Sequence, residues 1–143
     1  HKYYDGILPN QVDEKSEYYD ILKKVYKYPE SISKSLDNFK FRESVNTLID
    51  LARLGNKFLA DTEPWKLIKI EAHKRKVEEI MFISIQICGM LAILSEPFVP
   101  FASEKLKSIL NLRGKKWTEL NISLNIIDSK KLINNFKLAK NCK

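Results

Sequence analysis

The longest apolar pattern in the chain runs from Ile80 to Leu94, where only three positions interrupt the hydrophobic residues. A membrane-spanning helix needs about 20 consecutive apolar residues, so this run is too short for a comfortable span. Its length and its near-continuous hydrophobicity instead predict a helix that is surrounded by other helices. We therefore expect residues 80–94 to form the central helix of a bundle.

Residues 29–60 predict a second helical region that is interrupted near Asn38. In its stronger half, polar residues recur as one stripe and leave an apolar side broad enough to need neighbours in two directions. Asn56 continues one row of that side and is its polar exception. The predicted apolar side consists of Phe41, Val45, Leu48, Ile49, Ala52 and Leu59, widened by Leu51, Leu54 and Phe58.

Shorter helices are predicted on either side of this region. The first begins near Asp13, with acidic residues early and lysines late as the helix dipole favours, and Pro29 ends it. Another short amphipathic helix covers residues 101–112. The pattern as a whole predicts an all-α fold, an antiparallel helix bundle over residues 1–128, with a short strand or irregular segment near the C-terminus. Residues 129–143 are expected to be a tail or linker.

The segment Asp-Thr-Glu-Pro-Trp combines a helix stop and a helix start within a few residues. Asp61 or Thr62 is predicted to cap a helix that begins around Trp65, and Pro64 suits its first turn because proline needs no backbone hydrogen bond there. The charged residues 71–76 are expected to break this helix before the central one resumes.

Charge adds a preference for a polyanionic partner. The formal net charge is +7, and the excess is uneven, with ten basic and nine acidic residues in 1–60 against fifteen and nine in 61–143. Such a basic half favours nucleic acid, although a solvated lysine-rich surface has the same composition. The isolated Cys88 and Cys142 are typical of structural thiols in a reducing cytosol, so we expect a cytoplasmic protein.

Catalytic and metal-binding patterns are absent from the sequence. His1 and His73 have no nucleophile or carboxylate at a catalytic spacing, and no glycine-rich phosphate loop or zinc spacing is present. Adjacent Glu78 and Glu79 point in different directions on a helix, which disfavours a paired acid and base. We therefore expect a binding function, with no catalytic residue, metal or cofactor in this chain.

Trp65, preceded by Pro64 and followed by Lys66 and Lys69, is the candidate binding surface. Unpaired bases stack on aromatic side chains while lysines contact phosphates. Spacing alone favours the other interpretation, in which Trp65 anchors one helix to another. Asn56 can reach a base edge or be a buried, satisfied amide. Trp117 can stack on a base, but its spacing favours a role in closing the last loop over the core. The basic run 73–76 can contact phosphate, but such a run is more often a solvated turn.

Three blocks in a fixed order carry a family resemblance: HKYYDGILP, FKFRESVNTLIDLARLGNKFLADTEPWKLIK and LAILSEPFVPFASEKL. Together they resemble the α-helical anticodon-binding domain of methionyl-tRNA synthetases, over most of residues 1–120. The last block is shared by related class I synthetases for apolar amino acids. The alternatives are thus a domain from such a synthetase, or a helical module that binds a protein partner.

The resemblance implies roles for particular residues. The Pro-Trp turn, Pro64 and Trp65, would border the anticodon pocket of a methionine-specific tRNA, with Asn56 and Lys66 beside it. It also implies a longer parent enzyme whose catalytic domain lies upstream and charges tRNA with methionine using ATP, with a zinc-binding knuckle in that half. Further anticodon readers would precede His1. Many bacterial relatives continue into a C-terminal domain that dimerises, to which residues 129–143 would be a linker.

Overall fold

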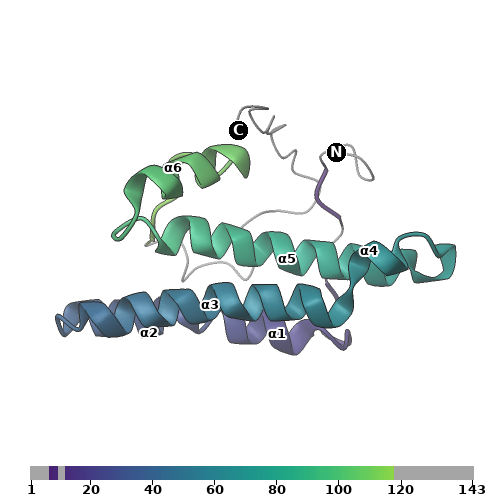
Figure 1. Cartoon of the computed structure of the whole chain (residues 1–143), viewed down its shortest axis with the longest axis horizontal. Coiled ribbons are helices and arrows are strands. Elements are labelled where there is room, and N and C mark those ends of the chain that lie inside the picture. The colour runs from purple at the N-terminus through teal and green to yellow at the C-terminus, as the bar shows by residue number, and fades with distance from the viewer. Residues whose placement is uncertain (1–6, 10–11, 118–143) are drawn as a thin grey trace, which may run out of the picture.

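The computed structural model describes residues 7–9 and 12–117, and the regular structure within these ranges is helical. Figure 1 shows how the helices are arranged. Their bounds are α1 Tyr19–Val25, α2 Tyr28–Asp37, α3 Phe41–Thr62, α4 Pro64–Leu67, a 3₁₀ turn Glu71–His73, α5 Lys74–Leu94 and α6 Pro100–Ile109. The predicted all-α antiparallel bundle is confirmed. The predicted strand or irregular segment and the tail at 129–143 lie outside the described residues.

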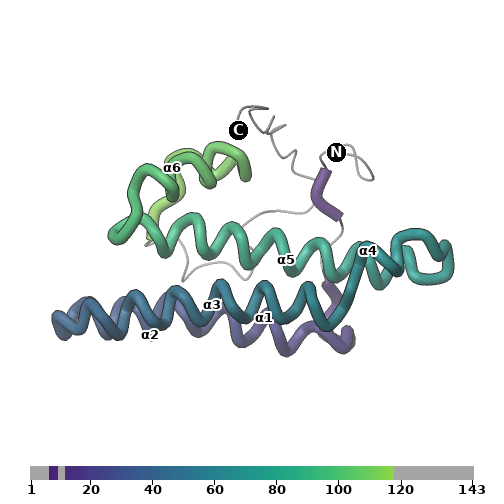
Figure 2. The backbone as a smooth tube through the Cα atoms, in the orientation of Figure 1, coloured from purple at the N-terminus to yellow at the C-terminus, as the bar shows by residue number. Residues whose placement is uncertain are grey.

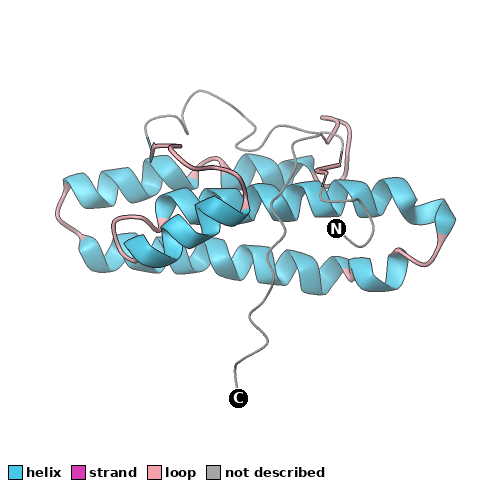
Figure 3. Ribbon diagram, turned by 90° about the horizontal axis from the view of Figure 1, so that it is seen from above, coloured by secondary structure: helices cyan, strands magenta, loops and turns pink. Residues whose placement is uncertain are grey.

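Helices α3 and α5 run antiparallel along the length of the bundle (Figure 1). Helix α2 packs against α3, and α6 folds back onto α5. The tube in Figure 2 shows that α4 and the 3₁₀ turn lie at one end, where the chain passes from α3 to α5. Figure 3, seen from above, shows the α2–α3 connection at the opposite end. The bundle therefore has two distinct ends.

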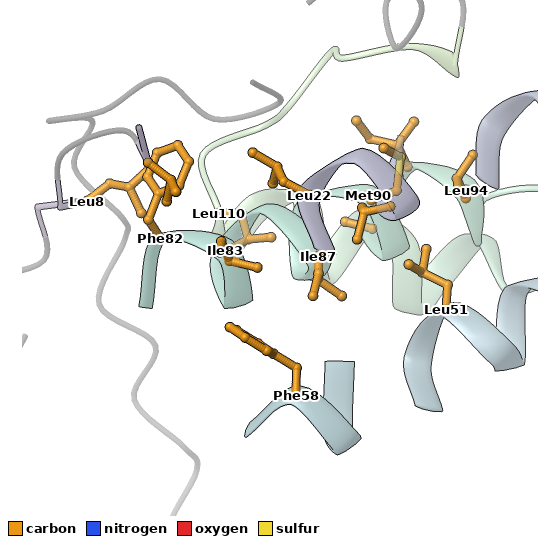
Figure 4. Packing of buried hydrophobic residues seen from close by; sticks show 14 of the residues in the cluster. Leu8, Leu22, Leu51, Phe58, Phe82, Ile83, Ile87, Met90, Leu94 and Leu110 are labelled. Carbon is orange, nitrogen blue, oxygen red and sulfur yellow. The ribbon is translucent and has the colours of Figure 1, made fainter. Parts of the chain in front are cut away.

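Helix α5 forms the centre of the core, as its apolar run predicts. It packs against α1, α3, α4 and α6, and its Phe82, Ile83 and Ile87 point into the cluster drawn in Figure 4. By length and composition, Glu71–Leu94 is the one segment of the described residues that could cross a membrane, but 61% of its most apolar window is buried inside the bundle. Its hydrophobicity is thus explained by the core.

Gly55 allows α3 to approach α5 closely. A Cβ atom built at Gly55 would lie 3.0 Å from Cγ2 of Ile87, which is closer than most such contacts in proteins. Ile87 is itself buried. The missing side chain therefore sets the separation of the two long helices.

One predicted helix start and one predicted helix cap are wrong, although a helix does begin at Pro64, next to the predicted start around Trp65. The first helix begins at Tyr19, not near Asp13, because local side-chain contacts replace a helical turn: the Tyr18 amide donates to Oγ of Ser16 at 3.2 Å. Asp61 and Thr62 do not cap α4, because both belong to the last turn of α3, and the Thr62 hydroxyl donates back to the Phe58 carbonyl at 2.7 Å. The predicted interruption near Asn38 is confirmed, since Asn38 caps α2.

The buried side of α3 is rotated about the helix axis relative to the predicted apolar side. Ser44, Leu51 and Phe58 are its buried residues, spaced by seven, whereas Phe41 and Ile49 are exposed. The buried row faces the space between α2 and α5, so apolar residues on the flank of the stripe are left in contact with solvent. The sequence pattern identified the helix but placed its centre of burial too far to one side.

Candidate nucleic-acid interface

The candidate site is the junction at which α3 ends and α4 begins. Glu63 alone joins the two helices, and its backbone is left-handed, with φ 41° and ψ 55°. Its amide still donates to the Leu59 carbonyl at 3.0 Å. Pro64 follows as the first residue of α4 and is buried. Because the linker is one residue long and proline fixes the next φ angle, the direction of α4 is tightly constrained.

Trp65 is 55% exposed at this junction. It is absent from the partly buried apolar residues that pack against the core, although its neighbour Leu67 is one of them. The interpretation of Trp65 as an interhelix anchor, which spacing alone favours, is therefore wrong. The turn holds a large aromatic side chain largely in solvent, while Pro64 and Leu67 attach α4 to the bundle.

Lys66 and Lys69 differ in their electrostatic surroundings. The ammonium of Lys66 lies 2.7 Å from a carboxylate oxygen of Glu63 in an exposed ion pair. Lys69 is exposed and has no ionic or hydrogen-bond partner among the described residues. An exposed ion pair contributes at most about 1 kcal/mol, so an incoming phosphate can compete for Lys66. Lys69 needs no such exchange.

Asn56 is exposed on α3, roughly two turns before that helix ends. A buried, satisfied amide is thereby excluded, and its side chain remains available to an external donor or acceptor. Pro64, Trp65 and Lys66 belong to the single turn of α4, Pro64–Leu67, and Asn56 lies in the C-terminal half of α3, the helix that ends at this junction. Glu63 was missed from sequence because glycine is the usual left-handed residue at such a junction.

A cavity of about 560 Å³ adjoins the junction, between α1, α3 and α4. Apolar residues including Leu54, Phe58 and Leu67 line it, and the lysines Lys24 and Lys57 are at its edge. Neither lysine has an ionic or hydrogen-bond partner among the described residues. The lining thus carries three lysines, Lys76 being the third, and one acidic residue, Asp61, so the charge beside α4 is positive on balance.

The basic run after His73 is engaged internally. Lys74 pairs with Glu71 at 3.8 Å, Arg75 with Glu79 at 3.4 Å, and Lys76 with Glu17 at 3.0 Å. The Tyr18 hydroxyl and the Glu17 carboxylate both raise the pKa of Lys76 by favouring its charged form. This run is consequently solvated and ion-paired, as predicted, but it is not a connecting turn, because Lys74, Arg75 and Lys76 form the first turn of α5.

Trp117 also has an internal role. It packs partly buried against the core, and its Nε1–H donates to Oγ of Ser33 at 2.9 Å. The prediction that it closes the last loop over the core is confirmed. No group of three metal-binding side chains occurs in residues 7–9 and 12–117.

Comparison with known proteins points to one family. The family model described as the anticodon binding domain of methionyl tRNA ligase matches residues 8–135. The methionine–tRNA ligase of Cytophaga hutchinsonii is 43% identical over 117 residues, which cover 82% of this chain and 17% of the relative. That of Christiangramia forsetii is 46% identical over 115 residues, covering 77% and 16%. The chain thus spans about one sixth of the length of these curated relatives.

Solved structures agree on the fold. The apo form of Mycobacterium tuberculosis methionyl-tRNA synthetase superposes with a TM-score of 0.82 at 17% sequence identity, covering 94% of this chain and 28% of that one. The same enzyme in complex with methionyl-adenylate gives a TM-score of 0.82, covering 94% and 27%. At this level of identity the superposition establishes the helical architecture only.

Proposed function

The chain belongs to the family of anticodon-binding domains of methionyl-tRNA ligase, and on this premise we propose that the α3–α4 junction contacts the anticodon loop of a methionine-specific tRNA. The observation that carries the proposal is the half-exposed indole of Trp65, which follows the buried Pro64 and makes no core contact. A core residue would be covered. A side chain that is exposed and oriented by a rigid turn is suited to an external flat ligand.

In this proposal an unpaired anticodon base stacks on Trp65. Stacking of a base on an aromatic side chain is worth about 1 to 3 kcal/mol and does not depend strongly on which base is present. Glu63 and Pro64 fix the direction of α4, so little orientational freedom of the turn is lost on binding. Trp65 thereby supplies affinity and position more than sequence selectivity.

Asn56 and Lys66 supply the polar contacts in the same proposal. An exposed amide carries both donors and acceptors, so Asn56 is able to read a base edge. Lys66 exchanges its Glu63 carboxylate for a phosphate, and Lys69, which has no described partner, takes a neighbouring one. Readers upstream of His1 would complete the pocket and add the selectivity that stacking lacks.

The remaining chemistry belongs to the parent enzyme in this proposal. Its upstream catalytic portion would use ATP to charge tRNA with methionine, and the zinc-binding knuckle expected from the resemblance would lie there too. The cytoplasm is the expected compartment, because that is where tRNA is charged and used. A dimerising domain after Lys143 is a further element of the proposal, with residues 129–143 as its linker.

The test is Trp65→Ala in the full-length ligase, assayed for binding of methionine tRNA. Loss of one stacked base should weaken binding by roughly 5- to 150-fold, the equivalent of about 1 to 3 kcal/mol. The free energy of unfolding should change by less than about 0.5 kcal/mol, because the indole is not part of the core. Trp65→Phe keeps an aromatic face, so its affinity for tRNA should lie between those of the unaltered ligase and Trp65→Ala.

Three results would contradict the proposal. Unchanged tRNA binding with a large loss of stability would make Trp65 structural. Equal binding of a tRNA with a replaced anticodon triplet would remove the methionine specificity and favour a related class I synthetase. Affinity that hardly changes with salt concentration would favour the helical protein-interaction module, because phosphate contacts make affinity fall steeply with salt.

A further inference from the structure

A pocket with an apolar floor and a charged edge lies between α1 and the C-terminal half of α3. It is the cavity of about 560 Å³ that adjoins α4. Small-molecule sites in proteins usually occupy about 300 to 1,000 Å³, so this volume suits a ligand of modest size. The residues to which we assign tRNA contacts are not among those that line it: Asn56, Trp65, Lys66 and Lys69. We call this cavity the α1–α3 pocket.

The floor of the α1–α3 pocket is apolar and partly aromatic. Tyr18 and Phe58 are buried there, with their rings edge to face and the ring centroids 5.6 Å apart. Ile21, Leu54 and Leu67 complete the floor, and each is only partly buried although it packs against the core. A flat apolar ligand would therefore be bound here by the apolar surface that it removes from water.

The charged residues of the pocket leave one positive charge in excess. Lys24 and Lys57 are exposed at its edge, and neither ammonium group has an ionic or hydrogen-bond partner among the described residues. Lys76 is paired with Glu17 at 3.0 Å and so adds no net charge. Asp61 is the one acidic residue of the lining, and it offsets one of the two unpaired lysines. The pocket therefore complements a ligand that carries a single negative charge.

The pocket and the stacking face proposed for Trp65 lie on different sides of α4. Leu67 lines the pocket, whereas Trp65 does not. The two residues are two positions apart, which separates their side chains by about 200° around a helix axis. A base stacked on Trp65 would consequently lie away from the pocket. The contacts proposed with tRNA thus do not account for this cavity.

We propose that the α1–α3 pocket binds a small amphipathic anion, a flat apolar molecule that carries one anionic group such as a carboxylate. Its apolar body covers Leu54, Phe58 and Leu67, and its anionic group pairs with the ammonium groups of Lys24 and Lys57. This inference goes beyond the proposed function and does not depend on it, since no tRNA takes part.

The probe anilinonaphthalene sulfonate has this chemistry, because it joins an aromatic ring system to one sulfonate. Full-length ligase labelled with para-fluorophenylalanine at Phe58 is titrated with the probe without tRNA and followed by fluorine NMR. We expect the signal of Phe58 to shift until the site is saturated. The control label is at Phe82, which is also buried but does not line the pocket, and its signal should not move. An unchanged Phe58 signal, or equal shifts at both positions, would overturn the proposal.

Charge variants test the contact with the anionic group at the same Phe58 label. Replacing both Lys24 and Lys57 with Ala should weaken binding of the probe about threefold or more, because two exposed ion pairs are lost. N-phenylnaphthylamine, which has the same rings without the sulfonate, should bind more weakly by a similar factor, and Asp61→Asn should strengthen binding of the sulfonate. The control is Lys34→Ala with Arg42→Ala, which removes two positive charges near the α2–α3 connection and should change nothing. Equal affinity for both probes, or equal effects of the two double variants, would overturn the proposal.

Two further measurements separate this inference from the proposed function. Trp65→Ala should leave the affinity for the probe unchanged, because Trp65 does not line the pocket. If that variant binds tRNA normally while the probe still binds, the proposed function fails and the pocket stands. Methionine tRNA added to the complex should leave the probe in place. Displacement of the probe by tRNA would assign the pocket to RNA and overturn the proposal.

Discussion

At the scale of single residues, the two ends of the bundle share a backbone feature. Phe39 and Glu63 both have positive φ angles, 58° and 41°, a conformation that residues with a side chain rarely adopt. Each precedes exposed aromatic residues, Phe41 in one case and Trp65 in the other. The third such residue among those the structure describes is Asn111, with φ 57°, but asparagine tolerates this conformation better than phenylalanine or glutamate does.

Phe39→Gly should stabilise the chain by about 0.5 to 1 kcal/mol, because it relieves the left-handed strain while removing a ring that buries little surface. Chemical denaturation of the 143-residue chain measures this change. Asn111→Gly is the matched control: Asn111 has φ 57°, but asparagine tolerates this region, so its effect should be much smaller. A destabilised Phe39→Gly variant would mean that the ring makes a contact within the chain.

Residue exposure was the weakest part of the sequence prediction. The position of Trp65 after a proline was predictable, but its exposure depends on how α3, α4 and α5 pack, which local spacing does not determine. For the same reason Asn56 had two interpretations, and the structure removes only the buried one. The Lys66–Glu63 pair was not predicted, because it requires Glu63 to adopt a left-handed conformation.

At the scale of helices, the hydrophobic pattern predicted which segments are helical better than it predicted where each helix begins and which side of it is buried. The near-continuous apolar run correctly indicated α5, and the starts predicted at residues 29 and 101 lie one residue from the observed starts of α2 and α6. The start of α1 was wrong because Ser16 offers the backbone a local alternative to helix. The centre of burial on α3 was wrong because a broad apolar stripe does not specify which part of it faces the core.

Helix α6 is fixed to α5 by polar contacts that no pattern predicted. The Ser103 hydroxyl donates to the Ala92 carbonyl at 2.6 Å. The buried ammonium of Lys107 lies 2.7 Å from Glu96, whose carboxylate is half exposed. Ser103 lies in the first turn of α6, close to Phe101, whereas Lys107 lies in its last turn and pairs with a residue of the connection that follows α5.

Glu96→Gln should therefore destabilise the chain by about 1 to 2 kcal/mol, because it leaves a buried cation without its counter-charge. The half-exposed carboxylate keeps this below the cost expected for a fully buried pair. Lys107→Met should be close to neutral, since it removes the charge that needs a partner. Glu43→Gln, in the exposed pair with Lys40, is the control and should change the free energy of unfolding by less than about 0.5 kcal/mol. Equal losses for Glu96→Gln and Glu43→Gln would contradict this account.

At the scale of the whole molecule, the positive charge is distributed unevenly along the chain. The excess of basic over acidic residues falls in the C-terminal part of the sequence, from residue 61 onward. Lys74, Arg75 and Lys76 are in ion pairs, so each of them, like Lys66, must exchange a carboxylate for a phosphate. Lys69 has no such described partner, and Lys66 has only an exposed one.

The salt dependence of tRNA binding tests this distribution. Each phosphate neutralised in a single strand contributes about −0.7 to the slope of log affinity against log salt, so replacing both Lys66 and Lys69 with Ala should make the slope shallower by about 1.4. Binding by the full-length ligase is measured from low to high salt. The control replaces Lys27, which precedes α2, and Lys34, which lies within α2, with Ala and should leave the slope unchanged. An unchanged slope for the Lys66 and Lys69 variant would remove both lysines from the phosphate contacts.

Helix α3 connects the two ends without interruption, from Phe41 to Thr62, and Glu63 passes its direction to α4 with no flexible linker. Its 22 residues make a rod of about 33 Å, so a tilt of about 5° at its N-terminal end would displace Trp65 by about 3 Å. That is close to the spacing between stacked bases. The domain therefore acts as a lever arm, and the accuracy with which α3 is held at its N-terminal end would determine which nucleotide the indole meets.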